Sequence, residues 1–311
     1  MQASNGAPEI GCSPNAEFLA TATTSSDEPD QSLVNANQSV DNNGSIRVLL
    51  WNTNKRSPDT TICQIAAQIP ADIVFLIEYS GCTTSLAASL SSATATGYVA
   101  APSMNDKLCC LHNNSSLDLS EIYFHKRFSV RRLRIRNTLA LICLVHGVDA
   151  MNNSLEARTE CAREMMSDLR RLHREQSAVG IIILGDLNLN PYDSPMNQAS
   201  VFNALMTKDC VSSGGRTFQG RYFDFFYNPM WSLLGDRNPG PPGTLYYTGN
   251  QGFYGWNMYD QVLLHHSLAD HLSEIKILDS IGSVNVATPR GRPNRNYSDH
   301  FPLFFAMQSL P

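Results

Sequence analysis

The stretch IIILGDLN, residues 181–188, shows in eight residues the pattern on which the predicted fold rests. Ile181–Gly185 predicts a strand buried on both faces, because short apolar runs of this length are typical of such strands. Asp186 and Asn188 follow directly, where the strand gives way to a loop. Taken alone, this Asp favours a tight turn, since turn formers are common at strand ends.

Polar side chains stand beside other predicted strands in the same way. They are Asn52 after the strand 46–50, Glu78 after 72–77, His146 after 141–145, and Asp299 and His300 directly before 301–307. Catalytic groups are commonly presented where rigid strands give way to loops. Each residue alone favours a structural role, but the repetition favours a functional site over a series of unrelated turns.

Glu78 carries the strongest indication of a metal ion. It follows six residues, five of which are apolar, so its carboxylate is expected to be buried. An unpaired buried charge is heavily penalised, and a hard divalent cation would satisfy it. Mg²⁺ prefers one or two carboxylates together with water and phosphate oxygens. Glu78, helped by Asn52 and a second acid, therefore predicts a magnesium site.

The net charge of −5 is unevenly distributed along the 311 residues. Residues 1–44 contain six acidic residues and no Lys or Arg, which leaves −5 − (−6) = +1 for the rest. This segment is rich in small polar residues and cannot bury enough surface to offset its ordering entropy, so we expect a disordered acidic tail. Residues 45–311 are expected to form the folded domain. A nearly neutral domain neither demands nor excludes a polyanionic partner.

Several protein classes are disfavoured by what the sequence lacks. No apolar run approaches the roughly 20 residues that span a bilayer, and the N-terminus does not resemble a secretory signal. The eight cysteines form no C-x-x-C pair, so the sequence does not indicate a zinc cluster. We expect reduced thiols in a cytoplasmic protein without a membrane span.

Helices are fewer than strands in the predicted order of elements. Ile62–Ile69 has helical spacing and ends at Pro70, and Ser154 can cap a helix that runs to about Gln176. Further strands are predicted near residues 121–124, 130–136, 139–146 and 258–264. Residues 212–257, rich in Gly, Pro and aromatics, are expected to form a long functional loop region. This order favours an α/β sandwich of mixed sheets over a regular parallel array.

Six segments, in this order, resemble the endonuclease/exonuclease/phosphatase superfamily. They are IRVLLWNTN (46–54), ADIVFLIE (71–78), LICLVHG (141–147), IIILGDLN (181–188), MYDQVLL (258–264) and YSDHFPL (297–303). GDLN together with SDHFPL is a specific combination. The resemblance implies a four-layered α/β sandwich, in which two mixed β-sheets are flanked by helices, and a catalytic domain over residues 45–311.

The resemblance also implies a metal site. Glu78 would be the principal ligand, with Asn52 nearby and Asp299 as a supplementary ligand. Mg²⁺ or Mn²⁺ would be the cofactor. Asn54 departs from the family pattern, which often has an acidic residue at that position, so more of the coordination would fall to water.

Five further residues would carry the catalysis in a protein that resembles this family. Asp186 would orient and deprotonate the attacking water, and Asn188 would position that water or bind phosphate. His300 would contact the scissile phosphate and serve as acid or base, and Asp260 would hold its tautomer. His146 would be a second phosphate-contacting histidine.

Arginines supply the candidate substrate contacts. They are Arg132, Arg134 and Arg136 on one face of a predicted strand, Arg158 at the start of a predicted helix, and Arg295 in the loop before the last strand. Arg forks bind phosphate, and basic clusters near a phosphoryl site favour nucleic acid or a highly phosphorylated ligand. A solvated basic edge strand explains the first group equally well, and a surface salt bridge explains Arg158.

The leading hypothesis is a divalent-metal-dependent phosphodiester hydrolase, in the first place a nuclease. A metal-bound water activated by Asp186 would attack a phosphate that histidines contact, and the partner would be nucleic acid or another phosphoester. The alternatives are a phosphatase or lipid phosphodiesterase of the same fold, or a catalytically inactive binding protein. Retention of both histidines and of the central acids argues against the inactive protein. The pattern specifies no oligomeric state.

Overall fold

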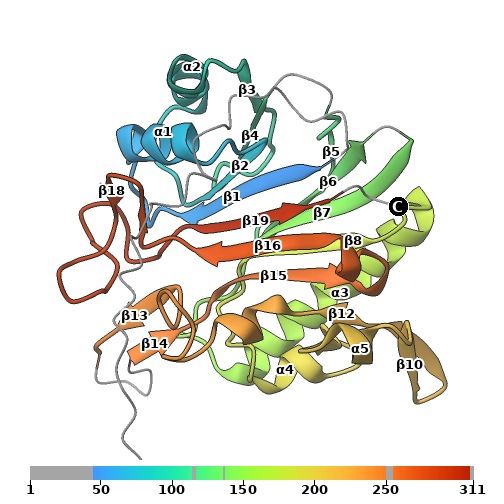
Figure 1. Cartoon of the computed structure of the whole chain (residues 1–311). Coiled ribbons are helices and arrows are strands. Elements are labelled where there is room, and N and C mark those ends of the chain that lie inside the picture. Colours follow the sequence, from blue (N-terminus) through green and yellow to red (C-terminus); the bar gives the residue numbers. More distant parts are fainter. Residues whose placement is uncertain (1–44, 114–116, 136, 250–254, 309–311) are drawn as a thin grey trace, which may run out of the picture. The chain divides into compact units, whose positions relative to one another are not determined.

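Two large β-sheets form the centre of the computed structural model, which describes residues 45–113, 117–135, 137–249 and 255–308 (Figure 1). Within these residues, the first sheet has six strands in the order β16 (Leu272–Ile277), β19 (Leu303–Met307), β1 (Ile46–Asn52), β2 (Ile73–Ile77), β4 (Leu108–Asn113) and β3 (Tyr98–Ala101). The second has seven, in the order β5 (Glu121–Phe124), β6 (Phe128–Ile135), β7 (Thr138–His146), β8 (Ile181–Asp186), β15 (Asp260–His265), β12 (Phe226–Tyr227) and β9 (Ala204–Leu205).

Both sheets are mixed. In the first sheet β1 runs parallel to β2 and antiparallel to β19. In the second sheet β8 runs parallel to β7 and antiparallel to β15. Parallel neighbours end at the same edge of a sheet, so β1 and β2 present their ends together, and so do β7 and β8.

Helices and short hairpins complete the described residues. The helices are α1 (Asp59–Gln68), α2 (Thr83–Thr94), α3 (Leu155–Gln176), α4 (Ser194–Asn197), α5 (Lys208–Val211) and the 3₁₀ helices η2 (Pro229–Leu233) and η3 (His266–His271). The hairpins are β10 (Gly215–Phe218) with β11 (Arg221–Asp224), β13 (Leu245–Tyr247) with β14 (Gly255–Asn257), and β17 (Ser280–Ile281) with β18 (Val284–Asn285). Among these elements, no helix has the length and apolar character that crossing a membrane requires.

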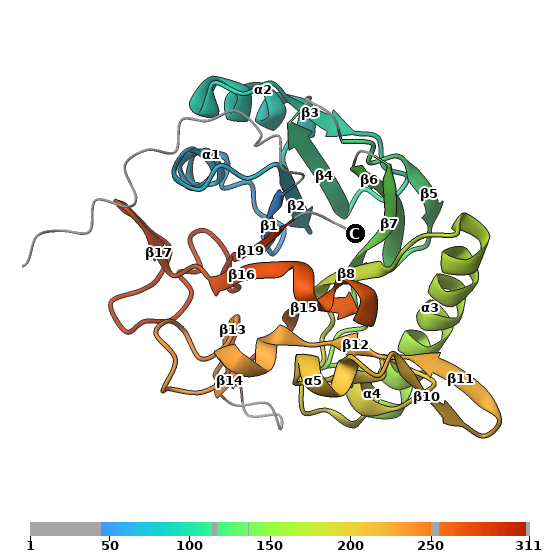
Figure 2. The ribbon, with the colours of Figure 1, turned by 45° about the vertical axis from the view of Figure 1, so that its right-hand side comes forward.

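Helices cover the outer face of each large sheet. Figure 2 shows α1 and α2 beside the first sheet and α3 beside the second. Alternation along β8 identifies the two faces of its sheet, because successive strand residues point to opposite sides. Ile182 and Leu184 pack in one core with the first sheet, whereas Ile181 and Ile183 pack with α3. The four-layered α/β sandwich predicted from the sequence is confirmed.

The predicted helix that follows Ser154 is present as α3. The Ser154 hydroxyl accepts a hydrogen bond from the Ala157 amide at 3.3 Å, as expected of an N-cap. Met166 and Leu169 are among the residues that form its buried face. The predicted strands beside β8 are present too, with ends shifted by one or two residues.

Other parts differ from the expectations. The polar stretch after Glu78 forms α2, and the long loop expected over 212–257 contains β10–β14 and η2 in its described part. The expected tail, residues 1–44, lies outside the described residues, as does Arg136. The seven described cysteines are unpaired.

Gly185 fits β8 only because it has no side chain. Its φ is +138°, and a Cβ at this position would lie 2.0 Å from the Val145 carbonyl oxygen of β7. We expect Gly185→Ala to lower the free energy of unfolding by about 3 kcal/mol, because strain and a backbone clash add. Urea denaturation followed by circular dichroism measures this loss.

Gly220→Ala is the matched control. Gly220 also has a positive φ, +74°, but nothing lies within 4 Å of the added Cβ. Only backbone strain remains, so we expect a loss of about 1 kcal/mol. Equal losses in the two variants would contradict the proposed steric conflict with β7.

Candidate active site

Three adjacent strands of the second sheet bring polar residues into one row. Asp186 on β8 pairs in register with His146 on β7 and with Asp260 on β15. Neighbouring strands lie about 4.8 Å apart, so these residues form a continuous line at the end of the sheet. The sequence placed each residue beside its own strand, and the pairing of the strands brings them together.

Asn52 adds a contact from the other sheet. Its side-chain amide donates a hydrogen bond to Asp186 Oδ2 at 3.0 Å, and both residues are buried. The backbone amide of Asn188 donates to Asp186 Oδ1 at 2.9 Å. The Asp186 carboxylate is therefore held in one orientation from two sides, where the ends of β1 and β8 meet.

The electrostatic surroundings make Asp186 a stronger base than an ordinary aspartate. Burial raises the pKa of its carboxyl, and the nearby Asp260 carboxylate raises it further. His300, His146 and the Asn188 amide act in the opposite direction without cancelling the rise. A carboxylate with a raised pKa accepts a proton more readily, which suits a general base.

His300 lies against Asp260. The imidazole Nδ1 donates to Asp260 Oδ2 at 2.6 Å, and both side chains are buried. Burial alone would lower the pKa of His300, but the Asp260, Asp186 and Asp299 carboxylates outweigh it and raise the pKa to about 10. The imidazolium form can donate from both ring nitrogens, so Nε2 can offer a proton to an anion.

Backbone contacts fix the position of this histidine. The indole nitrogen of Trp51 donates to the His300 carbonyl at 2.9 Å, and the His300 amide donates to Ser298 Oγ at 3.0 Å. Ser298 Oγ in turn donates to the Asn52 carbonyl at 2.6 Å. Ser298 and Trp51 belong to the motifs that indicated the site, but their supporting roles were not predicted from the sequence.

The Asp299 side chain lies close to that of the next residue, His300. Its Oδ1 is 3.8 Å from His300 Nε2, because the chain bends at Asp299 and the two side chains do not diverge. This separation is too long for a hydrogen bond, so Asp260 remains the hydrogen-bonded partner of His300. Asp299 Oδ1 is buried and has no hydrogen-bond partner among the described residues.

Glu78 follows the end of β2, and Ile77 pairs in register with Asn52. Its backbone adopts φ 53°, and its amide donates to the Lys107 carbonyl at 2.9 Å. The side chain is only partly buried, which corrects the expectation of full burial. Within the described residues, no hydrogen bond or ion pair engages its carboxylate.

These oxygens suit a hard divalent cation. Within the described residues, neither the Glu78 carboxylate nor Asp299 Oδ1 has a hydrogen-bond partner, whereas Asn52 Oδ1 accepts from the Asn54 amide at 3.0 Å. An oxygen-only donor set with one or two carboxylates favours Mg²⁺ or Mn²⁺ over softer metals. By the chemistry of their donor atoms, these residues therefore fit the expected metal.

Arg158 is placed against the loop that follows β8. Its Nη1 donates to the Asn188 carbonyl at 2.6 Å, and the residue is buried. Asn188 has φ 50°, so the guanidinium supports a tight turn in the left-handed region. A pocket lies beside this turn, and Arg158, Arg127 and Gly147 are among the residues that line it.

The other candidate arginines are not brought to this row. Arg132 pairs with Leu141 on β7, which lies five residues before His146 and thus about 17 Å along the strand. Its guanidinium donates to Gln176 Oε1, at 2.9 Å from Nε and 2.7 Å from Nη2, and Arg134 lies still further along. Antiparallel pairing puts both toward the start of β7, which corrects their expected place at the site. Arg295 is exposed in the loop before Asp299.

Comparisons with known proteins support the fold. No protein-family model and no curated protein matches the chain. A solved endonuclease/exonuclease/phosphatase family protein from Bacteroides thetaiotaomicron matches with a TM-score of 0.52 at 13% identity, covering 86% of this chain and 98% of that chain. This likeness confirms that the chain has the fold that the sequence motifs indicated.

Two further solved structures match the chain with similar TM-scores, identities and coverage. D. rerio TDP2 complexed with single-strand DNA product matches with a TM-score of 0.49 at 15% identity, over 84% of this chain and 98% of that chain. The endonuclease domain of TRAS1, a telomere-specific non-LTR retrotransposon, matches with a TM-score of 0.49 at 14% identity, over 86% and 99%.

Proposed function

We propose that this protein is a divalent-metal-dependent phosphodiester hydrolase that acts on nucleic acid. The observation that carries the proposal is the meeting of a buried base, Asp186, with a histidine–carboxylate pair, His300 and Asp260. A base and a proton donor on two sides of one reacting phosphate are what hydrolysis of a phosphodiester needs.

The contacts of each residue indicate its proposed role in the reaction. Asp186, held by Asn52, would take a proton from the attacking water, and the side chain of Asn188 would position that water. His300 Nε2 and His146 would contact the phosphate oxygens. Glu78, Asp299 and Asn52 would hold Mg²⁺ or Mn²⁺, which supplies neutralisation of charge on the phosphate.

An aromatic group on the hairpin β13–β14, whose Leu245 bridges to His300, supports nucleic acid as the substrate. Leu245 on β13 bridges to His300, so Tyr246 is the next residue along the strand. The Arg292 guanidinium lies 3.9 Å from the centre of the Tyr246 ring, and Trp256 meets the same ring edge-on at 5.1 Å. Aromatic rings with a neighbouring arginine bind nucleobases by stacking and the backbone by charge. Trp256 also stacks on buried Phe301, which anchors the hairpin.

A lipid substrate has less support in the described structure. Within residues 212–249 and 255–257, the exposed aromatic side chains are Phe218 and Tyr222, on the hairpin β10–β11. This hairpin ends at Asp224, which lies beside His265 at the opposite end of β15 from Asp260. Its exposed rings are thus distant from the row of catalytic candidates.

A parallel assay tests the proposal. Purified protein with Mg²⁺ or Mn²⁺ is incubated with plasmid, single-stranded DNA, RNA, bis-p-nitrophenyl phosphate, sphingomyelin vesicles and p-nitrophenyl phosphate. We expect cleavage of nucleic acid that EDTA abolishes and added metal restores. Turnover of the lipid alone or of the monoester alone would move the assignment to a lipid phosphodiesterase or a phosphatase. Turnover of none would support the inactive binding protein.

A further inference from the structure

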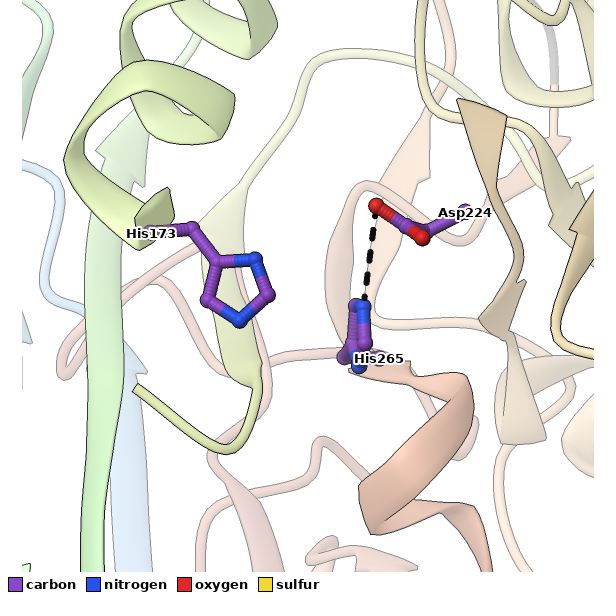
Figure 3. A group of neighbouring side chains, drawn as sticks. All are labelled: His173, Asp224 and His265. Atoms are coloured by element: carbon purple, nitrogen blue, oxygen red, sulfur yellow. Dashed lines mark ion pairs between the residues drawn. The ribbon is translucent and has the colours of Figure 1, made fainter. Parts of the chain in front are cut away.

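A second cluster of potential ligands lies at the other end of the second sheet. His173 belongs to the last turn of α3, Asp224 ends β11 and His265 ends β15. One nitrogen or oxygen from each residue lies within 4.8 Å of those from the other two. Figure 3 shows the two imidazole rings and the carboxylate facing one another from three separate elements.

Ser267 engages one ring nitrogen of His265 and leaves the other facing Asp224. Ser267 Oγ donates its single hydrogen to the Val179 carbonyl at 2.6 Å. This Oγ also lies 2.8 Å from His265 Nδ1, and the Ser267 backbone amide donates to the same nitrogen at 3.4 Å. Ser267 thus occupies Nδ1, and the other ring nitrogen, Nε2, lies 3.8 Å from Asp224 Oδ2.

Two ring nitrogens of this cluster are buried without a hydrogen-bond partner among the described residues. The His265 side chain is only 5% exposed, and its Nε2 has no hydrogen-bond partner among the described residues. His173 Nε2 is also buried without a partner in that part of the chain. Neutral imidazoles are the form that binds metals.

We propose that His173, Asp224 and His265 form a binding site for a divalent transition metal of the Zn²⁺ type, separate from the catalytic centre. Two imidazoles and one carboxylate are a ligand set that Zn²⁺ accepts, with water in the fourth position. Mg²⁺ and Ca²⁺ prefer oxygen ligands, so the imidazoles discriminate against them.

The distances in the metal-free cluster are slightly wider than a bound metal requires. In tetrahedral Zn²⁺ sites with bonds of about 2.1 Å, ligand atoms lie about 3.4 Å apart. The separations of 3.8 Å and up to 4.8 Å need rotations of side chains only. The Asp224 side chain is 33% exposed, which gives the ion a path from solvent.

The cluster is independent of the proposed catalytic metal. Asp260 and His265 are the first and last residues of β15, which puts them about 17 Å apart. A metal at this end would join the last turn of α3, the base of the β10–β11 hairpin and the end of β15. Zinc binding at this place therefore does not depend on the proposed hydrolase activity.

Zinc binding to the full chain tests this site. The protein is treated with EDTA, dialysed and titrated with Zn²⁺ by calorimetry in excess Mg²⁺, which would occupy the proposed site at Glu78. We expect one equivalent of Zn²⁺ to bind and to raise the melting temperature. His173→Gln and Asp224→Asn should each weaken this binding by about 100-fold or more, because each removes one of three protein ligands. Co²⁺ bound in place of Zn²⁺ should show tetrahedral visible absorption.

Matched variants separate this site from others. His271→Gln and Asp270→Asn change the same residue types nearby, outside the cluster, and should leave Zn²⁺ affinity unchanged. Glu78→Gln should also retain it. Circular dichroism of each metal-free variant checks that it folds. His173→Gln and Asp224→Asn each test the site separately. Zinc binding that persists in both cluster variants, or that only Glu78→Gln abolishes, overturns the proposal, as does the absence of zinc binding to the wild-type protein.

Discussion

Replacing His300 by alanine should reduce phosphodiester hydrolysis at least about 100-fold while the protein remains folded. His300 is the positively charged group among three carboxylates. Within the described residues its Nε2 makes no hydrogen bond, and it can contact phosphate. The variant loses this donor and leaves Asp260 Oδ2 without its 2.6 Å partner. The rate constant for bis-p-nitrophenyl phosphate at saturating metal measures the effect. A near-normal rate would rule out this role for His300.

Asp260→Asn separates a positioning role from direct contact. The amide has almost the same shape as the carboxylate, but it removes the charge that raises the pKa of His300. We expect a substantial loss of rate, and the double variant with His300→Ala should be little slower than His300→Ala alone, because residues that act as a unit are not additive. Losses that multiply in the double variant would show that the two residues act independently.

The central strands were predictable because they are buried on both faces. β2 and β8 are continuous apolar runs, and their polar end residues stand out against them. Parallel pairing of β7 with β8 then brings His146 beside Asp186 without any further signal in the sequence. The candidate residues of the metal and catalytic groups were thus found from local sequence, together with the resemblance of the motifs.

Long-range packing determined what the sequence did not reveal. Helix α2 buries Leu86, Ala87 and Leu90 among many Ser and Thr residues, so its periodicity was weak, and packing on the sheet compensates. The face of Arg132 could be predicted, but which end of β7 it lies beside depends on the pairing of the strands. The histidine–aspartate cluster of α3, β11 and β15 has no fixed spacing that a motif could describe.

Glu78→Gln should reduce the rate of hydrolysis about as much as His300→Ala, but by weakening the binding of the metal. The amide keeps the length and shape of the side chain, and its backbone at φ 53° is unchanged, so the fold should be retained. Removal of the negative charge weakens the attraction for a hard cation, which prefers carboxylate oxygens. We expect activity to fall at least about 100-fold at low Mg²⁺ and to recover partly as Mg²⁺ is raised, as for a weakened metal site.

The dependence of rate on Mg²⁺ concentration distinguishes this loss from that of His300→Ala. In Glu78→Gln the apparent dissociation constant for Mg²⁺ (the metal constant) should rise. In His300→Ala the maximal rate should fall, with less change in that constant. Asp299→Asn should shift the metal constant less than Glu78→Gln, because Asp299 Oδ1 also faces His300 Nε2 at 3.8 Å and is the supplementary ligand. Asp224→Asn, at the other end of β15, should not shift it. An unchanged metal constant in Glu78→Gln would mean that the catalytic cation is held elsewhere.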